Sequence, residues 1–177
     1  MAWNDLKAPQ GGGGNGKYLR LKNDGDEYRI RILAEPFIAQ EAWKDNKPVR
    51  KPLGVEWDPS EYDVDSEARK NAPREFWAMP VWNTNDQKIQ VWSITQPSIM
   101  GQLEELVKNA DWGAPTEYDI KVKRDRDKKN FVTYTVTPVP PRPLSGEVKT
   151  AWEDMCAFGQ FDLSRLIGGG DPFGVER

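Results

Sequence analysis

The chain has 177 residues, a formal net charge of -3 and an apolar content of 37%, which is enough for one domain with a moderate core. The chain has no histidine and a single cysteine, Cys156. This composition excludes an internal disulfide, a Cys/His zinc site and a catalytic triad with a histidine base. No run reaches the roughly 18 apolar residues of a membrane span, and the N-terminus lacks the pattern of a secretory signal. We therefore expect a soluble intracellular protein that is not an enzyme and holds no metal or cofactor.

Glycine and proline content divides the chain. Residues 1–16 end in GGGGNG and are expected to be a flexible lead, and residues 17–144 the main domain. Residues 145–167 are expected to be a C-terminal helical extension and residues 168–177 a flexible tail.

The first predicted strands are residues 17–22 and 27–33, separated by an Asn-Asp-Gly-Asp turn. A long excursion follows over residues 36–75. Within it, residues 37–43 and 47–53 fit a hairpin around Asp45 and Asn46, and residues 66–71 fit a short helix. A connection of this length in a compact domain is usually functional or disordered.

Residues 76–95 form the central predicted hairpin. We expect Val81 opposite Ile89 and Met79 opposite Val91, with a three-residue turn at residues 84–86 and a bulge or edge at Pro80. That register makes one face apolar. The other face mixes rings with polar and cationic groups: Phe76, Ala78, Trp82, Lys88, Gln90 and Trp92.

The remaining pattern predicts a helix over residues 96–109, strands over 117–124 and 131–138, and a basic turn at 125–130. An amphipathic helix is expected at residues 145–158. Five strands with a helix between the third and fourth is the plan of the OB barrel, so we predict a mainly β fold of that type with a long strand 1–2 loop.

Positive charge gathers in two segments. Residues 17–52 hold nine basic against six acidic groups, and residues 120–137 hold six against two. In an OB barrel both segments adjoin the face of the central hairpin. Cations beside exposed rings suit a single-stranded nucleic acid, because cations neutralise phosphates and unpaired bases stack on rings. The candidate binding residues are Arg20, Lys22, Arg29, Arg31, Trp43, Lys44, Arg50, Lys51, Trp57, Trp82, Lys88, Trp92, Lys121, Lys123, Arg124, Arg126, Lys128, Lys129 and Phe131.

Each of these residues also has a structural interpretation. Trp82 and Trp92 fit the core of a small barrel as well as a binding face. Arg29 and Arg31 fit a solvated face, and Lys128 and Lys129 fit a turn tip that only adds solubility.

Four strings, KYLRLKNDGDEYRIRIL, PVWNTNDQKIQVWSITQPSI, DWGAPTEYDIKVKR and FVTYTVTPVPPRPL, resemble the single-stranded DNA-binding proteins encoded by tailed bacteriophages. The resemblance implies an OB core that coats single-stranded DNA during replication and recombination in the cytoplasm of an infected bacterium. It also implies self-association on DNA and replication or recombination partners bound through the C-terminal region. Family members commonly end in a strongly acidic tail, whereas this chain ends in GGGDPFGVER.

Two alternatives stay open at this point. The first is an OB protein that binds RNA or anneals strands. The second is a metal-dependent nuclease that uses the acidic run Glu61, Asp63, Asp65 and Glu67. A solvated loop explains that run better, because its spacing lacks the glycine and closing glutamate of a calcium loop.

Overall fold

The computed structural model describes residues 16–174. In chain order its elements are β1 (Glu27–Ile32), β2 (Phe37–Lys44), β3 (Lys47–Pro52), the 3-10 helix η2 (Pro59–Glu61), β4 (Arg74–Asn83), β5 (Lys88–Ile94), α1 (Pro97–Lys108), β6 (Asp119–Arg126), β7 (Val132–Pro138), α2 (Gly146–Cys156) and the 3-10 helices η3 (Ala157–Gly159) and η4 (Leu163–Gly168). None of the helices in residues 16–174 has the length and apolar content to cross a membrane. The predicted lead spans residues 1–16, of which residues 1–15 lie outside the described part of the chain.

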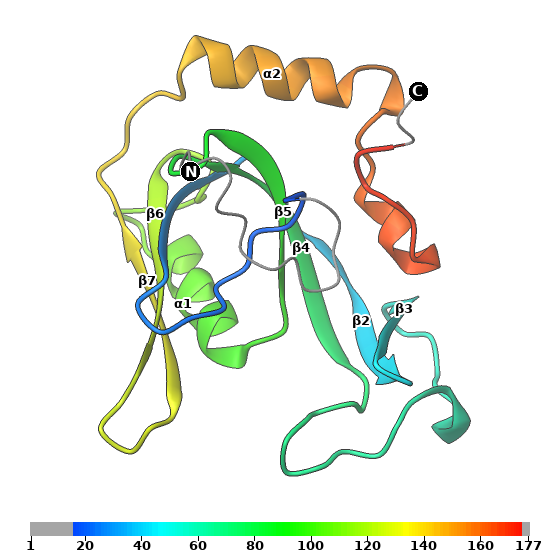
Figure 1. Ribbon diagram of the computed structural model, residues 1–177. Coiled ribbons are helices and arrows are strands. Elements are labelled where there is room, and N and C mark those ends of the chain that lie inside the picture. Colours follow the sequence, from blue (N-terminus) through cyan, green and yellow to red (C-terminus); the bar gives the residue numbers. More distant parts are fainter. Residues whose placement is uncertain (1–15, 175–177) are drawn as a thin grey trace, which may run out of the picture.

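All seven strands belong to one antiparallel sheet, which confirms the mainly β prediction. The order is β3-β2-β4-β1-β6-β7, and β5 pairs with β4. Within the described residues the sheet does not close into a barrel. Strand β4 is its longest member: the first half pairs with β2, the last residues pair with β1, and β5 runs beside it (Figure 1).

The predicted register of the central hairpin is wrong by one residue. Val81 lies opposite Gln90 and Met79 opposite Trp92, because the connection between β4 and β5 holds four residues rather than three. Side chains opposite each other share a face of the sheet. The slip therefore carries Trp92 to the apolar face of Met79 and Val81, where the indole is only 2% exposed.

No bulge interrupts the pairing of Pro80 with Val91. On the edge of β4 that faces away from β5, residues 74–78 pair with β2 and residues 81–83 pair with β1. Pro80 lies between these two ladders, so neither of them requires the N–H that proline lacks.

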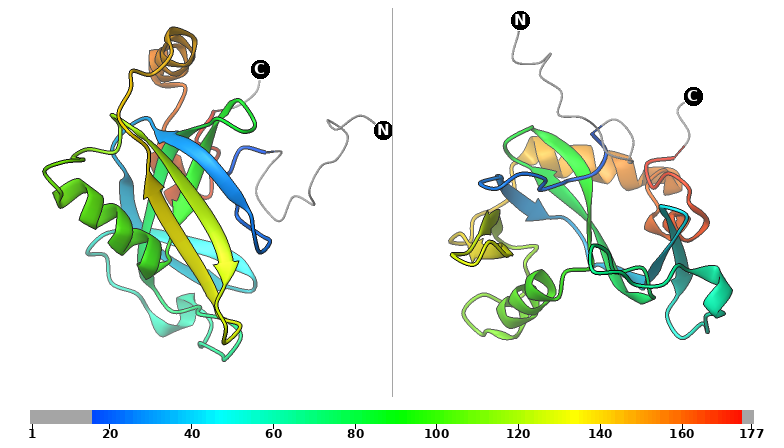
Figure 2. Two further views of the ribbon diagram at one scale, coloured as in Figure 1. Left: turned by 90° about the vertical axis from the view of Figure 1, so that its left-hand side faces the viewer. Right: turned by 60° about the horizontal axis from the view of Figure 1, so that its bottom comes forward.

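The main core occupies one side of the curved sheet. It joins Ile30 and Ile32 of β1 to Trp92 of β5, and α1 covers it with Ile99 and Leu103. Figure 2 shows α1 on one side of the sheet and α2 set apart from it. Gln102 of α1 donates to the carbonyl of Tyr134 and accepts from the N–H of Val136, which fixes the helix on β7.

A second apolar cluster lies on the opposite face of β4 and β5. It is formed by Ala39, Phe76, Ala78, Val91 and Leu166, and Phe161, Leu163 and Phe173 pack against it. Residues 168–174 of the predicted flexible tail make contacts here: Asp171 pairs with Lys17, and Pro172 is buried.

Three other local predictions can be compared with the structure. The hairpin at residues 37–53 is confirmed, and Asp45 and Asn46 adopt the positive φ angles that its two-residue turn requires. Residues 17–22 are not a strand, since only Tyr18 forms a bridge, to Val91. Residues 66–71 form no helix; the short helical turn of this loop is η2.

Candidate nucleic-acid interface

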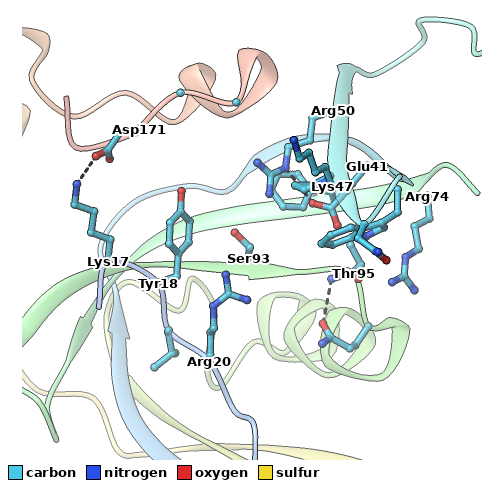
Figure 3. A pocket seen from close by; sticks show the side chains of 18 of the residues that line it. Lys17, Tyr18, Arg20, Glu41, Lys47, Arg50, Arg74, Ser93, Thr95 and Asp171 are labelled. Atoms are coloured by element: carbon cyan, nitrogen blue, oxygen red, sulfur yellow. Dashed lines mark hydrogen bonds and ion pairs between the residues drawn. The ribbon is translucent and has the colours of Figure 1, made fainter. Parts of the chain in front are cut away.

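A groove of about 900 Å³ opens on the face of the sheet that carries the second apolar cluster. Its walls come from residues 17–20, the β2–β3 hairpin, the loop before β4, the ends of β4 and β5, and residues 169–171 (Figure 3). We call this hollow the groove. It combines segments that are far apart in the sequence, because β4 brings β2 and β5 together on its two edges.

The groove is strongly positive. Six basic side chains line it against two acidic ones, Glu41 and Asp171. Both acids are paired with groove cations: Glu41 accepts from Arg50 Nε at 3.0 Å, and Asp171 accepts from Lys17. The basic set is Lys17, Arg20, Lys47, Arg50, Arg69 and Arg74.

Each aromatic ring in the groove has a guanidinium over its face. The central guanidinium carbon of Arg69 lies 4.5 Å from the ring of Trp43, and that of Arg50 lies 4.8 Å from the ring of Phe76. Arg20 lies 5.7 Å from the ring of Tyr18. These distances are within cation–π range. Phe76 is only 1% exposed under Arg50, whereas Tyr18 and Trp43 are half-buried. Rings and guanidinium planes both stack with nucleobases, so the groove offers two flat, cationic stacking positions, at Tyr18 and at Trp43.

The long loop before β4 holds Trp43 and Arg69 in place. The N–H of Trp43 donates to the carbonyl of Asn71, and its carbonyl accepts from the N–H of Asp63. Arg69 also donates to the side chain of Asn46 at 2.6 Å. Backbone hydrogen bonds thus attach this loop to the end of β2, and the loop brings Arg69 to the groove.

The surroundings of Tyr18 and Asp171 in the groove determine whether these two side chains are charged. Burial raises the pKa of the Tyr18 hydroxyl above its ordinary value, although Arg50 opposes the shift, so the phenol stays neutral at physiological pH. Burial is the largest single influence on Asp171 and would raise its pKa. The hydrogen bonds from Lys17 and from the N–H of Phe173, together with the charges of Lys17 and Arg165, outweigh burial and lower the pKa. Asp171 is therefore ionised and bound to Lys17.

One polar atom in the wall is unsatisfied. The hydroxyl of Ser93 is buried and has no hydrogen-bond partner in residues 16–174. Figure 3 shows it between Tyr18 and Thr95. A buried hydroxyl without a partner is costly unless a ligand satisfies it.

A smaller hollow of about 310 Å³ adjoins the groove and shares Leu19, Arg20, Ser93 and Gln96 with it. Lys22 and Arg124 line this smaller hollow. Arg124 also supports the neighbouring backbone, because it donates to the carbonyls of Leu21 and Lys22. Arg20 and Lys22 from the first basic segment therefore meet Arg124 from the second.

No protein-family model, curated protein or solved structure matches this chain.

The structure brings only part of the predicted site together. Arg20, Trp43 and Arg50 line the groove, and Lys22 and Arg124 line the hollow beside it. The other predicted residues lie outside the groove.

Two predicted positions are corrected. Trp92 is part of the main core, so its predicted place on a solvent-facing surface is wrong. Arg31 is 3% exposed, and Asp119 and the carbonyl of Arg142 accept its hydrogen bonds at 2.8 and 2.9 Å. Its charge is therefore used inside the protein and is not presented to a phosphate.

Three predicted residues of the long excursion, Lys44, Lys51 and Trp57, do not line the groove. Lys51 lies over the ring of Trp57 at 4.8 Å and pairs with Glu61 at 2.7 Å. The Nζ atom of Lys44 is 3.9 Å from Asp63. These contacts stabilise the loop rather than the groove.

The remaining predicted residues are spread over other parts of the sheet. Lys88 is exposed at the start of β5. Four others lie where the C-terminal end of β4 pairs with β1 and where β1 pairs with β6: Arg29, Trp82, Lys121 and Lys123. Arg126 at the end of β6 pairs with Asp24 at 2.9 Å. Residues 127–131 connect β6 to β7, and Lys128, Lys129 and Phe131 are exposed there.

Six cationic or aromatic residues of the groove were not among the predicted binding residues. They are Lys17, Tyr18, Lys47, Arg69, Arg74 and Phe76. Phe76 was placed on the correct face but not selected. Lys47 lies directly after the predicted Asp45–Asn46 turn, which is a signal that was available. Arg69 carries no local signal, because only the path of the loop brings it to Trp43. Arg74 carries none either, because it reaches the groove through the pairing of β4 with β2, where it lies opposite Glu41.

The acidic run of the loop serves the loop itself. Hydrogen bonds from Lys51 and from the N–H of Asp58 lower the pKa of Glu61. The N–H groups of Ala72 and Asn71 lower the pKa of Asp65. Asp63 accepts from the N–H of Asp45 at 2.9 Å. Within residues 16–174 no group of three His, Cys, Asp or Glu side chains is arranged to hold a metal ion.

Proposed function

We propose that this protein binds single-stranded DNA in the groove, without catalysis and with little sequence preference. The observation that carries the proposal is the lining of the groove, where six cations surround Tyr18, Trp43 and Phe76. Cations along such a groove neutralise phosphates, and flat groups between them accept unpaired bases.

The groove suits a single strand better than a duplex. Stacking on Tyr18 or Trp43 requires a base that is not already stacked in a duplex. Among residues 16–174, no helix that could enter the major groove of a duplex lines this site. Stacking tolerates every base, so discrimination among sequences is expected to be weak.

The strand order supports an OB-type core. Strands β5-β4-β1-β6-β7 follow one another, and α1 lies between β5 and β6 in the chain. A partly open OB barrel in which β5 and β7 are not joined would have this strand order, so the order supports that part of the proposal. The β2–β3 hairpin then corresponds to a long strand 1–2 loop that supplies much of the binding surface.

The biological role that we propose follows the resemblance to bacteriophage proteins. Binding by charge and stacking alone allows many copies to coat any exposed strand, as replication and recombination require. The partners and the self-association expected from that resemblance are part of the same proposal.

The proposal is tested by the fluorescence anisotropy of a labelled oligothymidylate over a salt series. Trp43→Ala removes a stacking position of the groove, whereas Trp57→Ala removes an indole that lies outside it. We expect Trp43→Ala to weaken binding by roughly 5- to 150-fold, since stacking of one base contributes about 1–3 kcal/mol. Trp57→Ala should bind like the wild type.

Failure of the wild type to bind any oligothymidylate at low salt would overturn the proposal. Equal losses in the two tryptophan variants would show that the groove is not the binding site. An oligouridylate of equal length, run as a competitor, separates DNA binding from RNA binding.

A further inference from the structure

A second cationic cluster lies at the other end of β4, and we call it the Asp119 cluster. The Nε atoms of Arg29 and Arg31 lie 2.7 and 2.8 Å from the two carboxylate oxygens of Asp119. Arg142 Nη2 is 3.9 Å from one of these oxygens. Three guanidinium groups therefore surround one carboxylate, which leaves an excess of two positive charges.

The three arginines have different roles. Arg31 is buried, and its other donors are taken by the carbonyls of Thr116 and Arg142. The side chain of Arg29 is 28% exposed and that of Arg142 is 63% exposed. Asp119 and Arg31 thus form a buried ion pair at the centre of the cluster, and Arg29 and Arg142 expose positive charge to solvent.

Lys121 extends this surface. It lies directly opposite Arg29 in the pairing of β1 with β6, on the same face, and it is exposed. The next lysine, Lys123, adds little, because Asp125 is 3.8 Å from its Nζ atom and Glu27 is its cross-strand neighbour. The positive surface is therefore confined to Arg29, Lys121 and Arg142.

We infer that Arg29, Lys121 and Arg142 form a second phosphate-binding site for the DNA strand that leaves the groove. Trp82 marks this end of β4, because it is the cross-strand neighbour of Arg31. Phe76, in the groove, is six residues earlier on the same face of β4, which is roughly 20 Å away. The inference rests on the proposed function for its ligand, and it extends the contacts along the strand.

The chemistry of the second site differs from that of the groove. The three side chains that form it are cationic and none is aromatic, whereas each ring of the groove is paired with an arginine. The second site therefore binds the backbone and leaves the bases free.

The test compares Lys121→Ala/Arg142→Ala with a control of equal charge, Lys108→Ala/Lys149→Ala, which removes exposed cations from α1 and α2. Arg29 is kept because its loss would disturb Asp119. Anisotropy is measured with oligothymidylates of five and thirty nucleotides. For the longer strand we expect an affinity loss on the order of ten-fold at 0.1 M salt, and a logarithmic salt slope that is about 1.4 smaller. For the shorter strand, binding should match that of the wild type.

Equal affinity of the double variant and the wild type for the longer strand would overturn the inference. So would an equal loss in the control variant, because that would be a general effect of net charge.

Inorganic polyphosphate, a polyanion without bases, separates this inference from the proposed function. We expect Lys121→Ala/Arg142→Ala to weaken polyphosphate binding and Trp43→Ala to leave it unchanged. If no oligothymidylate binds the wild type but polyphosphate does so through Lys121 and Arg142, the proposed function fails and the phosphate site stands. If polyphosphate binding does not depend on these two residues, the site is absent.

Discussion

The two faces of the β4–β5 hairpin are both largely covered, yet they have opposite chemistry. The inner face places Met79, Val81 and Trp92 in a core without charge. The outer face places Phe76 under Arg50 and leaves the hydroxyl of Ser93 unsatisfied. The inner face is thus built for stability, whereas the outer face keeps polar groups that a ligand can use.

The largest effect is expected on the inner face. Trp92→Ala removes a side chain that is almost fully buried, and we expect it to lower the free energy of unfolding by about 3–5 kcal/mol. Urea denaturation followed by circular dichroism measures this change. Trp82→Ala is the matched control: this indole is half-buried, so its loss should cost clearly less. Similar losses in both variants would contradict the observed register.

On the outer face, two arginines of the groove are expected to behave differently. Arg50→Ala leaves the carboxylate of Glu41, which is 8% exposed, without its partner and should lower the free energy of unfolding by about 2 kcal/mol. Arg74 is exposed, so Arg74→Ala should leave stability unchanged. Each variant should reduce the salt slope of single-strand binding by about 0.7. Denaturation and anisotropy on the same preparations give both values, and an unchanged slope would remove that residue from the interface.

The smallest effect is expected at Ser93. Ser93→Ala removes an unsatisfied buried hydroxyl, so the free energy of unfolding should stay equal or rise by up to about 1 kcal/mol. The affinity for oligothymidylate should match that of the wild type, because the buried hydroxyl has no accessible surface for a ligand to contact. Ser98→Ala, an exposed position on α1, serves as the control. A variant that is less stable than the wild type would contradict the absence of a hydrogen-bond partner for Ser93, and a loss of affinity would show that the hydroxyl does reach the ligand.

The sequence predicts most elements of this fold but not the register of its central hairpin. Turn residues and alternation identify β1, the β2–β3 hairpin, α1 and the β6–β7 pair close to their observed bounds. The register failed because both faces of β4 are covered, so apolar residues occur at successive positions of residues 78–81 and alternation carries no information. A connection of three residues fitted the pattern as well as the observed four.

The candidate site was predictable only where a residue lies in a hairpin with clear turn signals. Trp43 and Arg50 belong to such a hairpin, and Arg20 lies within residues 17–22, the first predicted strand before the Asn-Asp-Gly-Asp turn. Tyr18, Arg69 and Arg74 reach the groove through the path of a loop and through pairing between distant strands. No local pattern encodes those contacts, because they depend on how the whole sheet is assembled.

The length of β4 has a consequence for dissecting this protein into parts. One strand supplies Met79 and Val81 to the core under α1, and Phe76 and Ala78 to the cluster under the C-terminal segment. A fragment that keeps either cluster must therefore keep the whole strand, together with an uncovered apolar side. Within residues 16–174 the two apolar clusters cannot be divided into separate folding units, and neither half is a candidate for a minimal domain.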